Sequence, residues 1–111
     1  MSEFSEWEIS VEEYKEKSGK EGKHFLLDVR EEFETKIASI GGHLIPLSEL
    51  RDRIKELPED KDTELIVYCR TGNRSHHAMM YLKEQGFTKV KNLVGGIHAW
   101  HDRIDPEVKK Y

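Results

Sequence analysis

The sequence predicts an α/β fold in which a parallel β-sheet carries helices on both faces. Short apolar runs alternate along the chain with segments whose apolar residues recur at helical spacing. Within these runs polar and apolar residues do not alternate, which is typical of strands covered on both sides. Glycine or proline separates most of the segments and marks where the chain turns.

The first elements follow this pattern. A helix is expected to begin after Ser10, because Ser10 is a suitable N-cap and Glu13 stands three residues later. The run HFLLDV, residues 24–29, predicts a buried strand, and EEFETKIASI, residues 31–40, predicts one short helix. GGHLIPL, residues 41–47, predicts a turn followed by a short strand that a proline stops.

The segment SELRDRIKEL, residues 48–57, predicts a further helix that is capped by Ser48 and ended by Pro58. Its apolar residues are spaced for one helical face: Leu50, Ile54 and Leu57.

The second half of the chain contains the strongest strand signal. DTELIVYC, residues 62–69, contains a continuous apolar run, Leu65 to Tyr68, that leads directly to Cys69. SHHAMMYLKEQG, residues 75–86, predicts a helix that Gly86 ends with a left-handed C-cap. The last elements are a short strand, VKNLV, and a glycine-led helix, GGIHAWHDRI, at residues 90–94 and 95–104.

The length and net charge of the chain limit the classes of function that it can have. The 111 residues fit one domain, residues 1–111, and the net charge of −4 argues against nucleic-acid and membrane binding. No apolar run approaches the roughly 20 residues of a membrane span. The acidic stretch at residues 1–10 lacks the basic region of a secretory signal, so a cytoplasmic location is expected.

The loop that follows the strongest strand is the best candidate for a site. Binding sites collect at the carboxyl ends of parallel strands, and main-chain N–H groups at the start of a helix form an anion cradle. Such a cradle favours the anionic, nucleophilic form of Cys69. Arg70 and Arg74 add positive charge and can hold an oxyanion at two points, while Gly72 permits the turn.

A single cysteine at the end of a strand is more often a buried, inert residue than a catalytic one. For Cys69 the neighbouring residues favour function. Two arginines beside a buried thiol would be costly to bury without an anion to pair with.

The segment VYCRTGNRSHHAMMYLKEQGF, residues 67–87, resembles the active-site loop and following helix of rhodanese-like sulfurtransferases. Three other segments resemble the same family in the same order, and the resemblance extends from Phe25 to Trp100: LLDVRE, GGHLIPLSEL and NLVGGIHAW. The resemblance implies a single rhodanese-like domain with a five-stranded parallel sheet. In one segment the chain departs from the family, since Glu32 and Phe33 come early, and no role is assigned to Phe33 or Glu34.

The family resemblance also implies a mechanism. Cys69 is expected to take sulfur from thiosulfate or a persulfide, carry it as its own persulfide, and pass it to a thiol or cyanide. The expected partners are a small anionic donor and this acceptor, with a protein of a sulfur relay as a further partner, and no cofactor is needed. Asp28 and Arg30 are expected to support the loop. The loop residues expected to bind substrate are Arg70, Thr71, Gly72, Asn73, Arg74 and Ser75.

Three alternatives remain open at this point. A cysteine-dependent phosphatase or arsenate reductase uses a similar thiolate, but only four residues separate Cys69 from Arg74, and this shorter loop favours sulfur. A non-catalytic rhodanese-like binding module usually lacks the cysteine. A simple redox thiol could form no internal disulfide, because the chain has one cysteine.

The histidines do not predict a metal site. His76 and His77 are adjacent, so on a helix they diverge by about 100°. His98 and His101 can share one face but have no third ligand nearby, and packing is the favoured interpretation.

Overall fold

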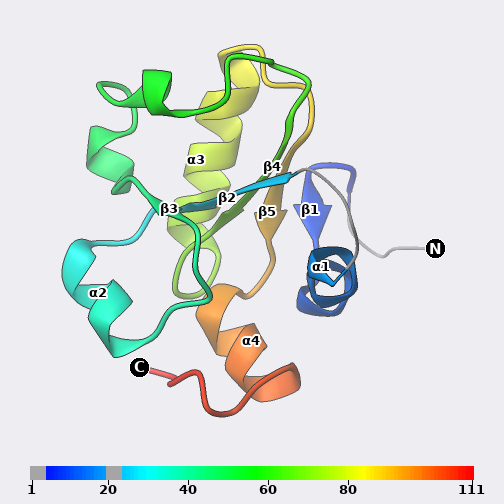
Figure 1. Ribbon diagram of the computed structural model, residues 1–111, viewed down its shortest axis with the longest axis vertical. Helices are drawn as coiled ribbons and strands as arrows, with labels where there is room; N and C mark the ends of the chain where they lie inside the picture. The colour runs from blue at the N-terminus through cyan, green and yellow to red at the C-terminus, as the bar shows by residue number, and fades with distance from the viewer. Residues whose placement is uncertain (1–4, 20–23) are drawn as a thin grey trace.

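A five-stranded parallel sheet forms the centre of the computed structural model, which describes residues 5–19 and 24–111 (Figure 1). The order of the strands is β1-β5-β4-β2-β3. They are β1 (Glu8–Ile9), β2 (His24–Asp28), β3 (His43–Leu44), β4 (Glu64–Tyr68) and β5 (Val90–Leu93). The predicted five-stranded parallel sheet is confirmed. The first four residues of the acidic stretch at residues 1–10 lie outside the described residues.

Helices cover both faces of the sheet, as predicted. They are α1 (Val11–Ser18), α2 (Glu32–Ile37), α3 (Asn73–Glu84) and α4 (Gly96–Arg103). Two short 3₁₀ turns, η1 (Leu47–Glu49) and η2 (Ile54–Glu56), lie between β3 and β4. Residues of α3 and of the segment holding η1 and η2 form one apolar cluster with the sheet, and residues of α1 and α4 form a second one.

Strand β4 explains why the central apolar run shows no alternation. Leu65 and Val67 belong to the cluster on the α3 side, whereas Ile66 and Tyr68 belong to the cluster with α1 and α4. All four side chains are fully buried. Both faces of β4 are therefore core, and the strand delivers the next residue, Cys69, to the carboxyl edge of the sheet.

The predicted start of α1 and end of α3 are confirmed. Ser10 Oγ accepts a hydrogen bond from the Glu13 N–H at 3.0 Å, and Glu13 Oε1 accepts one from the Ser10 N–H at 3.0 Å. This reciprocal pair satisfies two N–H groups that the first turn of a helix leaves without a partner. Gly86, just beyond α3, has a φ of +99°, a conformation that favours glycine.

The single helix predicted over residues 48–57 is wrong. The backbone there forms η1 and η2, in which hydrogen bonds reach back three residues, and Arg53 lies between them with a φ of −113°. Leu50 and Leu57 are buried in the core, so their spacing reports packing but not a continuous helix. Arg53 donates to the carbonyl oxygen of Leu44, which ties this segment to the end of β3.

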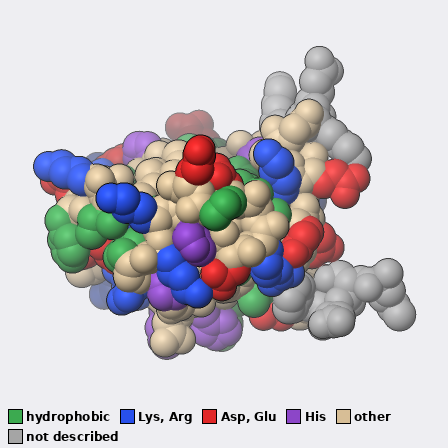
Figure 2. All heavy atoms as spheres, turned by 90° about the horizontal axis from the view of Figure 1, so that it is seen from below, with side chains coloured by type: hydrophobic (Ala, Val, Ile, Leu, Met, Phe, Trp, Pro, Cys, Tyr) green, Lys and Arg blue, Asp and Glu red, His purple; other side chains and the backbone are tan. Residues whose placement is uncertain are grey.

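The strands point toward the end of the molecule that carries α2, α4 and the start of α3 (Figure 1). Figure 2 looks onto this end, where basic, acidic and histidine side chains lie intermixed. The surface near the candidate site is therefore not a uniformly basic field. In the described part of the chain, no helix is long and apolar enough to cross a membrane.

Candidate active site

The thiol of Cys69 lies in a cradle of main-chain N–H groups at the carboxyl edge of the sheet. Cys69 is 1% exposed, and its Sγ accepts hydrogen bonds from the N–H groups of Gly72 at 3.1 Å and Ser75 at 3.4 Å. Gly72 has a φ of +108°, which turns the loop over the sulfur just before α3 begins. These two N–H groups and the N-terminal end of α3 stabilise a negative charge on the sulfur.

A side-chain network from β5 supports this loop. Ser75 Oγ lies 3.3 Å from Cys69 Sγ and donates to Asn92 Oδ1 at 2.6 Å. Asn92 Nδ2 in turn donates to the carbonyl oxygen of Gly72 at 3.2 Å. Because Asn92 uses its amide nitrogen on Gly72, its oxygen must accept from Ser75, and the Ser75 oxygen is then free to accept the Cys69 S–H. Asn92 is a site residue that the sequence reasoning missed.

The start of α4 closes against the back of the loop. The N–H groups of Ile97 and His98 donate to the carbonyl oxygens of Cys69 and Arg70, each at 3.1 Å. These contacts satisfy N–H groups at the helix start with loop carbonyls, so the two segments hold each other. A Cβ at Gly96 would collide with the carbonyl oxygen of Cys69 and lie 2.8 Å from that of Arg70.

Gly96→Ala is therefore expected to destabilise the fold. Gly86→Ala is the matched control, since Gly86 also has a positive φ but no atom lies within 4 Å of an added Cβ. The backbone strain of about 1–2 kcal/mol is common to both variants, and the collision adds about 2 kcal/mol at Gly96. Urea unfolding of the two variants measures this difference. Equal losses would show that the contact between α4 and the loop is loose.

Arg74 is held by a carboxylate on α2. Its Nη1 and Nη2 donate to Glu34 Oε2 at 2.6 Å and Oε1 at 2.8 Å. Glu34 is only 5% exposed, and the hydrogen bonds from Arg74 lower its pKa to about 2. The sequence assigned no role to Glu34 and expected Arg74 to bind the donor. In the structure, the two are an ion pair at the edge of the loop.

Arg70 lies exposed at the mouth of the loop. Its Nε donates to the main-chain oxygen of Tyr111 at 2.5 Å, and its guanidinium lies 5.1 Å from the centre of the Tyr111 ring. His98 Nε2 lies 2.7 Å from the same oxygen. The C-terminal segment thus passes beside the mouth of the cradle and holds Arg70 there.

Asp28 and Arg30 form a buried pair beyond the loop. Arg30 is fully buried, and its Nε and Nη2 donate to the two oxygens of Asp28, each at 2.9 Å. Burial opposes the charge of Arg30, but hydrogen bonds with Asp28 and Tyr111 outweigh it and raise the pKa of Arg30. Arg30 also donates to the main-chain oxygen of Glu34 at 3.4 Å. The pair therefore contacts the loop indirectly, through Glu34 and its partner Arg74.

The remaining predicted loop residues, Thr71 and Asn73, are exposed at the rim of the cradle. Most of the histidines make hydrogen bonds or ring contacts within the protein. His101 Nδ1 lies 2.8 Å from the main-chain oxygen of Val108, and the rings of His76 and His77 pack edge to face. Among the described residues, no group of three or more His, Cys, Asp or Glu side chains is placed to hold a metal ion.

Known structures share this architecture. A rhodanese-related protein from Thermoplasma volcanium is 35% identical, with a TM-score of 0.76 over 87% of this chain and 92% of that one. The reduced CoADR-RHD protein of Bacillus anthracis is also 35% identical, with a TM-score of 0.79 over 94% of this chain and 18% of that one.

Sequence relatives agree with the structural ones. Adenylyltransferase and sulfurtransferase MOCS3-1 of Zea mays is 38% identical over 109 residues, covering 93% of this chain and 23% of the relative. A sulfurtransferase of Allochromatium vinosum is 48% identical over 58 residues, covering 52% of this chain and 48% of the relative. The chain thus spans less than half the length of these relatives. The model of the rhodanese-like domain matches residues 10–103, and the chain belongs to the rhodanese-like family.

Proposed function

We propose that this protein is a sulfurtransferase that carries sulfane sulfur as a persulfide on Cys69. The observation that carries the proposal is the cradle, in which the N–H groups of Gly72 and Ser75 converge on a single sulfur atom. Membership of the rhodanese-like family and the names of two relatives support the same function.

The reaction has two steps. The Cys69 thiolate attacks the outer sulfur of the donor, a sulfur–sulfur bond forms at Sγ, and the donor's own sulfur–sulfur bond breaks. Its electron pair leaves with sulfite when the donor is thiosulfate, or with a thiolate when the donor is a persulfide. A thiol or cyanide then attacks the terminal sulfur, and the electron pair returns to Cys69. No oxidant is consumed, and ping-pong kinetics are expected.

The loop residues have distinct roles in this scheme. Main-chain N–H groups between Arg70 and Ser75 hold the negative charge of the thiolate and then of the persulfide. The exposed guanidinium of Arg70 attracts an anionic donor to the mouth of the cradle. Asp28 and Arg30 keep Glu34, and through it Arg74, in place. The acceptor includes proteins of a sulfur relay, because the loop lies at the surface.

Intact mass measures the first step. After treatment with thiosulfate or cysteine persulfide, the protein is expected to gain one sulfur atom, and cyanide is expected to remove it as thiocyanate. Failure to gain sulfur from either donor, together with hydrolysis of an aryl phosphate, would point to a phosphatase. Inertness in both assays would favour a non-catalytic binding module.

A further inference from the structure

Charges around the cradle are already largely balanced by the protein itself. In the described part of the chain, Arg74 holds Glu34 at 2.6 and 2.8 Å, and Arg30 holds Asp28 at 2.9 Å. Arg70, by contrast, is exposed, and its hydrogen bonds to the main-chain oxygen of Tyr111 and to His98 Nε2 both come from Nε, so they do not occupy its two Nη groups. The positive charge open to a donor is therefore chiefly that of Arg70.

A dianionic donor would have to compete with Glu34 for Arg74. Two-point hydrogen bonding between a guanidinium and a carboxylate is among the stronger pairings in proteins. Drawing Arg74 away would also leave the buried Glu34 carboxylate without its positively charged partner, which is costly. The Arg74 guanidinium is thus not available to pair with the second negative charge of thiosulfate.

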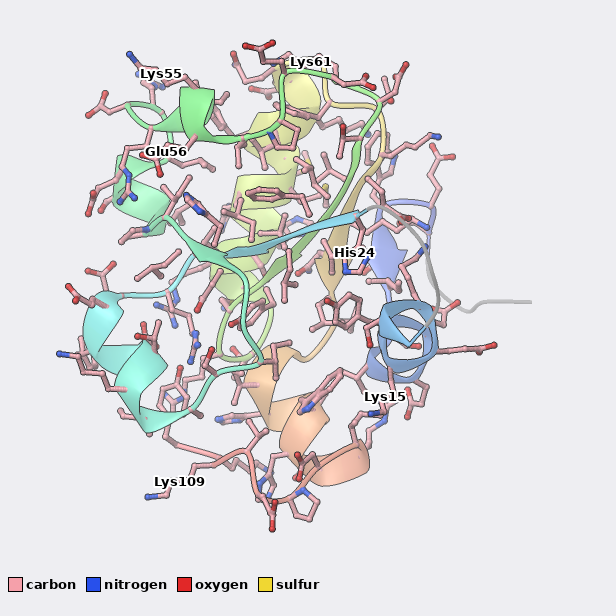
Figure 3. The ribbon with its side chains drawn as sticks, in the orientation of Figure 1. Lys15, His24, Lys55, Glu56, Lys61 and Lys109 are labelled. Atoms are coloured by element: carbon pink, nitrogen blue, oxygen red, sulfur yellow. The ribbon has the colours of Figure 1, made fainter. Side chains whose placement is uncertain are left out.

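A singly charged donor does not need Arg74 as a partner for a second negative charge. The N–H groups of Gly72 and Ser75 and the end of α3 provide stabilisation for one anionic sulfur. The two lysines of the C-terminal segment are directed elsewhere. Lys110 pairs with Asp102 at 3.0 Å, and Figure 3 shows Lys109 pointing outward from the C-terminal segment.

We propose that Glu34 is a specificity-determining residue, which occupies Arg74 and thereby directs Cys69 toward singly charged persulfide donors and away from dianionic thiosulfate. The inference rests on the sulfurtransferase function proposed above. In the favoured reaction, the Cys69 thiolate forms a bond to the outer sulfur of the persulfide anion R–S–S⁻. The bond between the two donor sulfurs breaks, R–S⁻ leaves with the electron pair, and the transferred sulfur keeps its negative charge as the end of the Cys69 persulfide.

The test compares two donors in the wild type and in Glu34→Gln. The amide keeps the shape of the side chain but removes its charge, so Arg74 becomes available to thiosulfate. The ratio of kcat/KM for thiosulfate to kcat/KM for cysteine persulfide is expected to rise at least about tenfold, which corresponds to about 1.4 kcal/mol. An unchanged ratio in a folded variant would overturn the inference.

Glu56→Gln is the matched control. Glu56 also accepts from an arginine, Arg53, at 2.7 Å, so this variant has the same change in net charge and loses a similar ion pair. Figure 3 shows Glu56 on η2, far from α4 and the start of α3. The donor ratio of Glu56→Gln is expected to match that of the wild type. A rise equal to that of Glu34→Gln would mean that overall charge, and not Arg74, sets the ratio, and would overturn the inference.

A second variant keeps the test decisive if Glu34→Gln does not fold. In the double variant Glu34→Gln/Arg74→Gln the pair has no net charge, as in the wild type. Its ratio of the two kcat/KM values is therefore expected to stay within about threefold of the wild-type ratio, which is a small difference on the affinity scale. A tenfold fall would show that Arg74 serves thiosulfate despite Glu34. If the wild type takes sulfur from neither donor, the proposed function itself fails, and this outcome is distinct from a wrong donor preference.

Discussion

Cys69→Ser is expected to take up no sulfur and to lose sulfurtransferase turnover to background. A serine oxygen can accept the N–H groups of Gly72 and Ser75, but it cannot form a persulfide. Because the chain has one cysteine, no other thiol can replace it. Loss of a covalent nucleophile typically costs a factor of at least about a thousand.

Folding must be shown to survive in this variant. Cys69 is 1% exposed, so a hydroxyl there is buried, but its hydrogen-bonding partners remain. The free energy of unfolding is expected to fall by no more than about 1–2 kcal/mol, which urea unfolding measures. The intact mass of the variant after treatment with thiosulfate or cysteine persulfide should be unchanged. Sulfur retained by a folded Cys69→Ser protein would contradict the role of Cys69.

The sheet could be predicted from the sequence because its central strands have apolar residues at consecutive positions and not only at alternate ones. Each position of β4 from Leu65 to Tyr68 faces one of two cores, and so the run is continuously apolar. Strand β1 (Glu8–Ile9) was not predicted, since two residues are too few to show a period. The wrong helix at residues 48–57 has a related cause, because Leu50 and Leu57 are anchored by tertiary contacts that override local helix propensity.

The loop could be predicted, while two of the residues that support it, Asn92 and Glu34, could not. Cys69 to Ser75 are contiguous, and a strand that runs into a helix implies where their N–H groups point. Asn92 and Glu34 come from β5 and α2 and meet the loop only through the strand order. For Glu34 there was a signal, an acidic residue in a short helix after Asp28 and Arg30. Its partner cannot be read from spacing along the chain.

The buried pair of Asp28 and Arg30 is expected to make a large contribution to the stability of the fold. Asp28→Leu is expected to lower the free energy of unfolding by about 3–5 kcal/mol, because it leaves the fully buried Arg30 charge without a carboxylate. Tyr111 and the main-chain oxygen of Glu34 also accept from Arg30, but neither carries a balancing charge at these atoms.

A double-mutant cycle separates the charge from the packing. Asp28→Leu/Arg30→Met replaces the pair with apolar side chains and leaves no buried charge, so it should be more stable than Asp28→Leu alone. Losses that simply add would mean that the two side chains contribute independently. The double variant also tests whether the pair supports the loop. If the pair holds Glu34, and through it Arg74, the double variant should fold yet transfer sulfur more slowly than the wild type. Wild-type turnover in a folded double variant would show that the cradle stands without this support.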